Sequence, residues 1–152
     1  MLKARKNETQ DEIFVRQIAS QYSQSVIFVS GHPDAYAILL LQPGRSRVIY
    51  GGETTPRQSD DVCAQAFAAG YSTDENRLLL DFRQYTGTIN WDYVKKQSAA
   101  MSRRNLPPRK IAFVMRDEYA IPTARALALW LRHQETRVFD DIDKAEEWLG
   151  WV

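Results

Sequence analysis

Apolar and polar positions change period along this chain in blocks, and the first clear block predicts a β-hairpin. Residues 36–42 are almost entirely apolar, and residues 47–50 form a second short run of strand-forming type. Pro43 and Gly44 lie between the two runs. Proline presets φ at the first central position of a turn, and glycine accepts the positive φ that a type II turn requires at the second. We therefore expect the two runs to pair as antiparallel strands.

A helix is predicted directly after the hairpin, from Thr55 to Gly70. The Thr55 hydroxyl can cap the helix, Pro56 suits the first helical position, and Gln58 completes a capping box. Val62 and the apolar residues after it recur at helical spacing. Gly70 is a natural end, because the residue after a helix often adopts a left-handed conformation.

The alternation of strand and helix continues to the end of the chain. Further strands are predicted at residues 77–82, 110–115 and 136–139. Helices are predicted to start near Asn90, at Pro122 and at the aspartates of positions 140, 141 and 143. The complete order is β-β-α-β-α-β-α-β-α. Strands that alternate with helices of this length indicate right-handed crossovers. We expect an α/β domain with a mainly parallel sheet and an antiparallel first strand.

Several predicted strands are apolar at successive positions, as at residues 38–41, 78–80 and 111–115. Runs without alternation indicate strands that are covered on both faces of a sheet. Residues 1–34 offer such a cover. Phe14, Ile18 and Tyr22 are spaced four apart in a predicted amphipathic helix, and a β-prone run follows at residues 26–29.

Two interpretations of residues 1–34 stay open. In the first, this segment packs on the α/β domain, residues 35–152, or on a second copy of that domain in a homodimer. In the second, it is a frayed N-terminal arm that carries an amphipathic helix.

Size, charge and cysteine content exclude several classes of protein. A chain of 152 residues fits one domain, and 44% hydrophobic with 26% charged residues is ordinary for a globular protein. The formal net charge of +1 gives no general electrostatic reason to bind nucleic acid or an anionic membrane. No stretch approaches the roughly 20 apolar residues of a membrane span, and the N-terminus lacks the apolar run of a secretory signal. Cys63 is the single cysteine, so an intramolecular disulfide is excluded, and we expect a cytoplasmic protein.

Candidate catalytic and metal-binding residues are few. His32 and His133 are the only histidines, and neither has a neighbour spaced to share a metal ion, so we expect no metal and no cofactor. Cys63 falls inside a predicted helix, near its apolar side, where cysteine is usually inert packing. Asp81 and Asp117 lie at or just beyond the carboxyl ends of two predicted strands, where open α/β sheets bind ligands. Acid–base chemistry is one interpretation of these two carboxylates. The favoured one is that each accepts hydrogen bonds from the adjacent loop, and we expect no enzymatic activity.

One stretch of the chain is strongly basic. Its members are Lys95, Lys96, Arg103, Arg104, Arg109 and Lys110, and no acidic residue lies between the first and the last. Such a patch could bind phosphates, anionic lipid or an acidic partner. The stretch contains no aromatic residue for base stacking. We therefore favour a solvated helix end, where positive charge is favourable.

The order of elements and several local phrases resemble the STAS-like domains, the sulfate-transporter and anti-sigma-factor-antagonist group, in particular bacterial proteins related to the sporulation anti-anti-sigma factor. The resemblance covers residues 35–152. It is carried by the hairpin, by Leu-Leu-Leu-Asp-Phe-Arg at residues 78–83, by the turn at residues 85–91 and by residues 137–149. It implies helices largely on one face of the sheet, and a role in protein interaction or small-ligand sensing.

In regulatory members of that group, a serine or threonine after the Asp-bearing strand is phosphorylated by a partner kinase. Thr86 and Thr88 occupy this neighbourhood, although the usual Asp-Ser-Ser-Gly phrase is absent. A phosphate here would meet free backbone N–H groups at a helix start. The other interpretation is that both threonines shape a turn.

Our first hypothesis for the function is a non-enzymatic regulatory or interaction domain with a protein partner of unknown identity. Its surface would lie around Tyr85 to Trp91 and could extend through the end of the strand at residues 110–115 and residues 116–119. Trp91 and Tyr119 would be the aromatic anchors, because aromatic residues dominate binding energy. The alternative is a binder of a small apolar or amphipathic ligand in a pocket between sheet and helices. That pocket would be lined by Phe67, Met115 and Trp130.

Overall fold

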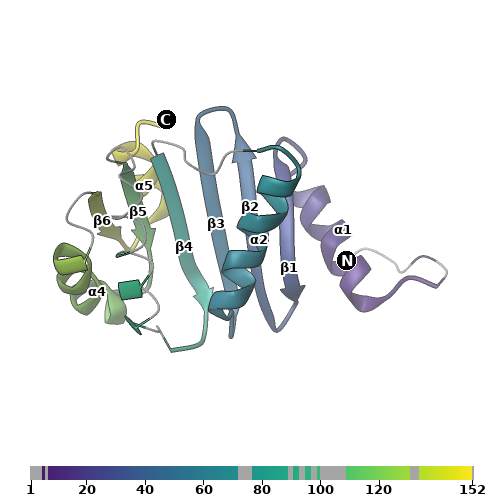
Figure 1. The fold of residues 1–152 in the computed structure, drawn as a ribbon, viewed down its shortest axis with the longest axis horizontal. Helices are drawn as coiled ribbons and strands as arrows, with labels where there is room; N and C mark the ends of the chain where they lie inside the picture. The colour runs from purple at the N-terminus through teal and green to yellow at the C-terminus, as the bar shows by residue number, and fades with distance from the viewer. Residues whose placement is uncertain are drawn as a thin grey trace.

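Six strands form one sheet in which each strand lies beside the strand that precedes it in the chain, in the order β1-β2-β3-β4-β5-β6 (Figure 1). The strands are β1 (Val26–His32), β2 (Ala35–Gln42), β3 (Arg45–Gly52), β4 (Arg77–Tyr85), β5 (Lys110–Val114) and β6 (Glu135–Phe139). The helices with defined bounds are α1 (Gln10–Gln21), α2 (Pro56–Ala68), α4 (Asp117–Trp130) and α5 (Ile142–Trp148). This computed structural model describes residue 5 and residues 7–71, 77–88, 91–92, 95–96, 99, 109–130 and 134–151.

The first three strands form an antiparallel meander, and the later strand pairs are parallel. β2 and β3 pair around the predicted turn, where Gly44 has a φ of 71°. β3 pairs with β4, β4 with β5 and β5 with β6 in parallel. The predicted hairpin and the mainly parallel α/β sheet are therefore confirmed.

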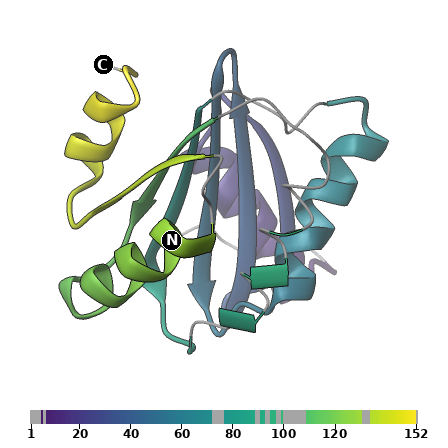
Figure 2. The same cartoon turned by 60° about the vertical axis from the view of Figure 1, so that its left-hand side comes forward.

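Helices that connect strands cover one face of the sheet, and the helices at the two ends of the chain cover the other. α2 joins β3 to β4 and α4 joins β5 to β6, and both lie on one face, whereas α1 and α5 lie on the other (Figures 1 and 2). The strand order advances in one direction, so right-handed connections place the joining helices on one side. α1 precedes the sheet and α5 follows it, so neither is bound by that rule. The predicted gathering of helices on one face thus holds for α2 and α4 and does not extend to α1 and α5.

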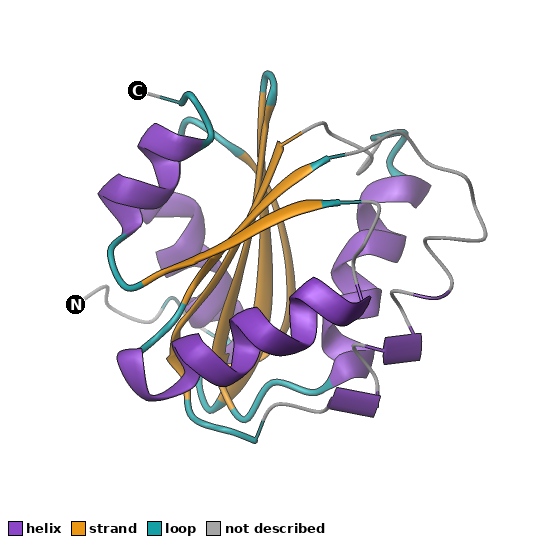
Figure 3. Ribbon diagram, turned by 90° about the vertical axis from the view of Figure 1, so that its left-hand side faces the viewer, coloured by secondary structure: helices purple, strands orange, loops and turns teal. Residues whose placement is uncertain are grey.

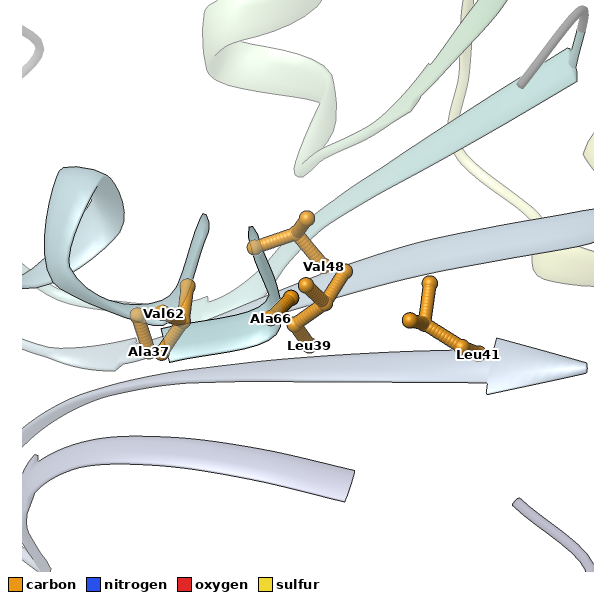
Figure 4. Packing of buried hydrophobic residues seen from close by; sticks show 6 residues of the cluster. All are labelled: Ala37, Leu39, Leu41, Val48, Val62 and Ala66. Carbon is orange, nitrogen blue, oxygen red and sulfur yellow. The ribbon is translucent and has the colours of Figure 1, made fainter. Parts of the chain in front are cut away.

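β2 is buried on both sides, which accounts for its unbroken apolar run. On one face Ala37, Leu39 and Leu41 pack with Val48, Val62 and Ala66 (Figure 4). On the other face Ile38 and Leu40 pack with Ile49 and with Phe14 and Ile18 of α1. Figure 3 shows the strands lying between helices on both sides. The prediction that both sheet faces are covered is confirmed for this strand.

β5 is covered in the same way by the two C-terminal helices. Ile111, Phe113 and Met115 pack with Leu127 of α4. Ala112 and Val114 pack with Leu79 and with Ala145, Leu149 and Trp151 from α5 and the residues after it.

The N-terminal segment continues the sheet and the core. Thr9 caps α1 by accepting a hydrogen bond from the Glu12 N–H at 3.1 Å, and the Phe14 ring lies 5.1 Å from that of Tyr36. β1 pairs with β2 from Val26↔Leu41 to His32↔Ala35. The sheet therefore runs without a break across residue 34, where the sequence pattern placed the start of the α/β domain.

The predicted helix starts differ in accuracy. α2 begins at Pro56 with the predicted capping box between Thr55 and Gln58. α4 begins at Asp117, and Pro122 lies inside it. The prediction that Pro122 opens this helix is wrong. Thr123 and Leu127 of α4 are buried against the sheet. This packing stabilises the helix by more than is lost because proline cannot donate a backbone hydrogen bond.

Basic side chains from the sheet hold the end of α5. Arg77 donates a 2.6 Å hydrogen bond to the backbone carbonyl of Leu149, and Arg45 donates one to that of Trp151. Arg47 forms an ion pair with Glu146. The last carbonyls of a helix lack partners within it and carry partial negative charge, so guanidinium groups stabilise them.

Candidate functional site

The central parallel strand, β4, carries a bulge near its carboxyl end. Ile49 of β3 is level with Asp81, but Gly51 is level with Gln84. Two residues of β4, Phe82 and Arg83, therefore oppose the single residue Tyr50. We call these two residues the β4 bulge.

Asp81 holds the β4 bulge together. Its Oδ1 accepts hydrogen bonds from the Arg83 backbone N–H at 3.1 Å and from Arg83 Nε at 3.0 Å. Its Oδ2 accepts a third from Arg83 Nη2 at 2.8 Å. Asp81 is only 3% exposed, whereas the Arg83 side chain reaches solvent. A buried carboxylate paired in this two-pronged way satisfies both its charge and the N–H of a residue inside the bulge.

The ion pair between Asp81 and Arg83 lies on the α1 and α5 face of the sheet. Leu79 packs with α5, and Asp81 follows it by two residues on the same face of β4. Hydrogen bonding to Asp81 raises the pKa of Arg83.

The β4 bulge determines the face of the sheet on which the side chains of the following residues, Gln84 and Tyr85, lie. The Tyr36 hydroxyl, on the α1 face, donates a hydrogen bond to Gln84 Oε1. The Tyr36 ring crosses Gly51, where a Cβ would overlap it. Tyr85 stands on the opposite face, its ring centroid 5.8 Å from that of Phe82 in an edge-on contact.

The chain after β4 forms an anchored turn, which we call the β4 turn (residues 86–88). The Thr86 N–H donates to the Gly52 carbonyl at 2.9 Å. The Tyr85 hydroxyl donates to the Thr88 carbonyl at 2.6 Å, and Gly87 lies against the Tyr85 ring. Thr86 and Thr88 are both exposed. The β4 turn thus presents two hydroxyl side chains on a backbone that is fixed at both ends.

A row of aromatic rings supports this end of the sheet from the α2 and α4 face. Tyr50 stacks on Phe82 with centroids 4.4 Å apart, and Phe82 stacks on Phe113 at 6.4 Å. The Tyr50 hydroxyl shares a 3.3 Å hydrogen bond with Ser59 of α2. Burial raises the pKa of Tyr50 to about 12.

The raised pKa of Tyr50 predicts a loss of stability in alkali. Between the ordinary value of 10.0 and about 12, the unfolded chain releases a proton that the folded chain keeps. The contribution of Tyr50 to stability is therefore complete below pH 10 and is lost as pH rises towards 12. Tyr50→Phe should make urea midpoints measured from pH 9 to 12 less dependent on pH. Tyr71→Phe, at an exposed tyrosine, is the matched control, and an unchanged profile in Tyr50→Phe would contradict the assignment.

The structure separates several of the residues that the sequence singled out. Asp81 lies within β4, four residues before its end, rather than at the strand end. Asp117 is the first residue of α4, and its side chain, like that of Tyr119, lies outside the described part. Trp91 is helical and half-buried. The expectation that Asp81 lies at the strand end is therefore wrong, and its carboxylate is bonded to Arg83 within the strand.

The predicted basic patch lies only partly within the described residues. The Lys110 ammonium lies 4.9 Å from the centre of the Trp148 ring, on the α5 face. Arg109 is half-buried just before β5, and its backbone N–H donates to Gln134 Oε1 at 2.7 Å. Lys95 and Lys96 are exposed, and Arg103 and Arg104 lie outside the described residues.

The residues predicted to line an apolar pocket do not converge where they are described. Phe67 is 81% exposed on α2, whereas Met115 is buried under α4. The side chain of Trp130 lies outside the described part. Phe67 is therefore a surface residue rather than part of a pocket wall.

Sequence reasoning missed Tyr36, Gln84, Arg83 and the glycine pair Gly51 and Gly52. The signal was the glycine pair at a strand end, because glycine in a strand often marks a close approach by another group. Gly51 makes room for the Tyr36 ring, and Gly52 has a φ of 60° that suits glycine.

Two further classes of site are tested by the described residues. Within that part of the chain, no three His, Cys, Asp or Glu side chains gather where they could hold a metal ion. None of the described helices combines the length and apolar character that crossing a membrane requires.

The sequential sheet, the crossover helices on one face and the turn at the end of the central parallel strand together define an α/β domain of the STAS-like type. A family model described as SpoIIAA-like matches residues 46–150, which is more than half of the chain. The chain therefore belongs to the SpoIIAA-like family, and the predicted STAS-like resemblance is confirmed. The match begins in β3, so α1, β1 and β2 lie before it.

Among solved structures, the chain is similar to an uncharacterized protein with a SpoIIAA-like fold from Shewanella loihica PV-4. The TM-score is 0.49 and the sequence identity 12%, with 82% of this chain and 93% of that chain covered. No curated protein matches this chain.

Proposed function

We propose that this chain is a non-enzymatic regulatory domain that binds a protein partner through the β4 turn. The observation that carries the proposal is the anchoring of this turn at both ends while its two threonine hydroxyls stay exposed. A turn that is ordered before binding loses little conformational entropy when a partner docks. Exposed hydroxyl groups on an ordered turn are available for recognition by a partner.

Membership of the SpoIIAA-like family supports the same proposal. The resemblance to regulatory STAS-like proteins places their partner-facing segment directly after the Asp-bearing strand. In this chain that position is the β4 turn, followed by Trp91 at a helical position. Trp91 is the aromatic residue best placed to contribute binding energy beside the threonines.

The test is affinity capture from native lysate with the intact chain and three variants. Thr86→Asp with Thr88→Asp adds negative charge to the β4 turn, and Trp91→Ala removes the aromatic side chain. Ser23→Asp is the matched control, because Ser23 is exposed in the turn before the edge strand β1, and two strands separate β1 from β4. A protein that wild type and Ser23→Asp retain, and that the double variant and Trp91→Ala lose at least tenfold, is the expected result.

Retention of the same proteins by every variant would show that the β4 turn is not the contact surface. The captured protein is then to be identified by mass spectrometry and its affinity remeasured with the purified pair. Loss of affinity in the purified pair must follow the same order of variants for the proposal to stand.

A further inference from the structure

Asp81 stands on the face of the sheet opposite to the side chain that braces the β4 turn. It follows Leu79 by two residues, and Leu79 packs with α5, so Asp81 points to the α1 and α5 face. Tyr85 contacts Phe82 on the α2 and α4 face. No direct contact therefore joins Asp81 to the residues that hold the turn, and any influence must pass through the backbone of β4.

The backbone connection is the β4 bulge. In a regular strand successive side chains alternate between faces, so a strand continuing from Asp81 would place Gln84 on the face of Phe82 and Tyr85 on the face of Asp81. The extra residue reverses this order. Gln84 instead reaches Tyr36 on the α1 face, and Tyr85 reaches Phe82 on the other.

The reversal is what allows the Tyr85 hydroxyl to meet the Thr88 carbonyl and the Thr86 N–H to meet Gly52. A shift of one residue in register would move Tyr85 to the wrong face and break both anchors. Bulges are commonly used in this way to redirect side chains beside functional sites.

We infer that Asp81 is a positioning residue for the β4 turn: by holding the β4 bulge, its carboxylate sets the face on which Tyr85 stands and so fixes the exposed threonines. The three hydrogen bonds from Arg83 carry this role, since one of them takes the backbone N–H of a bulge residue. The burial of Asp81 ties the carboxylate to Arg83, because an unpaired buried charge would be strongly unfavourable. The inference rests on the proposed function only in taking the β4 turn as a binding surface. The effect of Asp81 on the geometry of the turn does not depend on that function.

The geometry is tested by NMR on the full-length chain without any partner. The variants are Asp81→Ala, which removes every acceptor, and Asp81→Asn, which keeps one oxygen for the Arg83 N–H. Glu146→Gln is the matched control, because it breaks the ion pair to Arg47 and leaves the bulge untouched. The readouts are amide exchange at Thr86, relative to Leu39 in the middle of β2, and the ring-to-ring NOE between Phe82 and Tyr85.

We expect Asp81→Ala to speed exchange at Thr86 about tenfold relative to Leu39, as the loss of one protecting hydrogen bond implies. The Phe82–Tyr85 NOE should disappear. Asp81→Asn should fall between Asp81→Ala and wild type, and Glu146→Gln should match wild type. A loss of overall stability alone would instead speed exchange at Thr86 and Leu39 together. If Asp81→Ala does not fold, Asp81→Asn decides alone. Wild-type exchange at Thr86 together with an intact NOE in the folded variants overturns the inference.

Affinity capture with Asp81→Asn separates this inference from the proposed function. If the NMR measurements show a displaced β4 turn in the Asp81 variants but the wild-type chain captures no partner, the positioning role is supported and the proposed function is overturned. If the turn is undisturbed in the Asp81 variants and partner capture is lost only in Thr86→Asp with Thr88→Asp, the proposed function is supported and the positioning role is overturned.

Discussion

Replacing Phe14 or Ile18 with alanine should lower the free energy of unfolding by about 2–5 kcal/mol for each variant. Both side chains are buried against Ile38, Leu40 and Ile49 on the α1 face of the sheet. Removing either leaves a cavity over apolar strands that have no other described cover at this point. Urea unfolding followed by circular dichroism measures the change.

Val15→Ala is the control for this experiment. Val15 lies on the same helix but is 45% exposed, so the change should stay within about 0.5 kcal/mol of wild type. Deleting residues 1–24 should have a larger effect, with a lowered melting temperature and self-association through the uncovered face. An unchanged melting temperature and oligomeric state after the deletion would support the frayed-arm interpretation instead.

Gly52→Ala should also be severely destabilising, by about 3 kcal/mol or more. Gly52 has a φ of 60°, and a Cβ at this position would overlap the backbone carbonyl of Asp34, which cannot rotate away as a side chain can. The same residue accepts the hydrogen bond from Thr86, so the β4 turn should loosen together with the β1–β2 turn. Thermal unfolding and amide exchange at Thr86 measure the two effects.

Gly44→Ala separates backbone conformation from crowding. Gly44 has a similar φ of 71°, but a Cβ there would meet no atom within 4 Å. The expected loss is about 1–2 kcal/mol, the ordinary penalty of a left-handed conformation. Equal losses in the two variants would show that the overlap with Asp34 has no energetic effect.

Local signals in the sequence predicted most of the fold. The Pro43–Gly44 turn and the capping box at Thr55 depend on residues close in sequence, and both formed as expected. The unbroken apolar run of β2 correctly indicated cover on both faces. The pattern of apolar residues predicts burial correctly where the helix that covers a strand decides which of its side chains are buried.

The contacts that build the β4 turn could not be predicted from the sequence, and the role of its threonines stays a prediction. Thr86 and Thr88 were found from the strand before them, yet the β4 bulge depends on how β4 aligns with β3, some 30 residues earlier. Asp81 and Arg83 are two apart, a spacing that in a regular strand only places them on one face. The helix start at Pro122 was predicted wrongly because proline, although common at the first position of a helix, also occurs inside one. In α4 the burial of Thr123 and Leu127 compensates for the backbone hydrogen bond that Pro122 cannot donate.

The strand order has a consequence for the way this chain can be made. Every strand pairs with its immediate predecessor, so no strand has to be inserted between two that are already joined. As the polypeptide leaves the ribosome from its N-terminus, the sheet can grow at one edge only. α1 can cover the first three strands before β4 is synthesised, and the crossovers through α2 and α4 each add one strand and one helix to a surface that already exists.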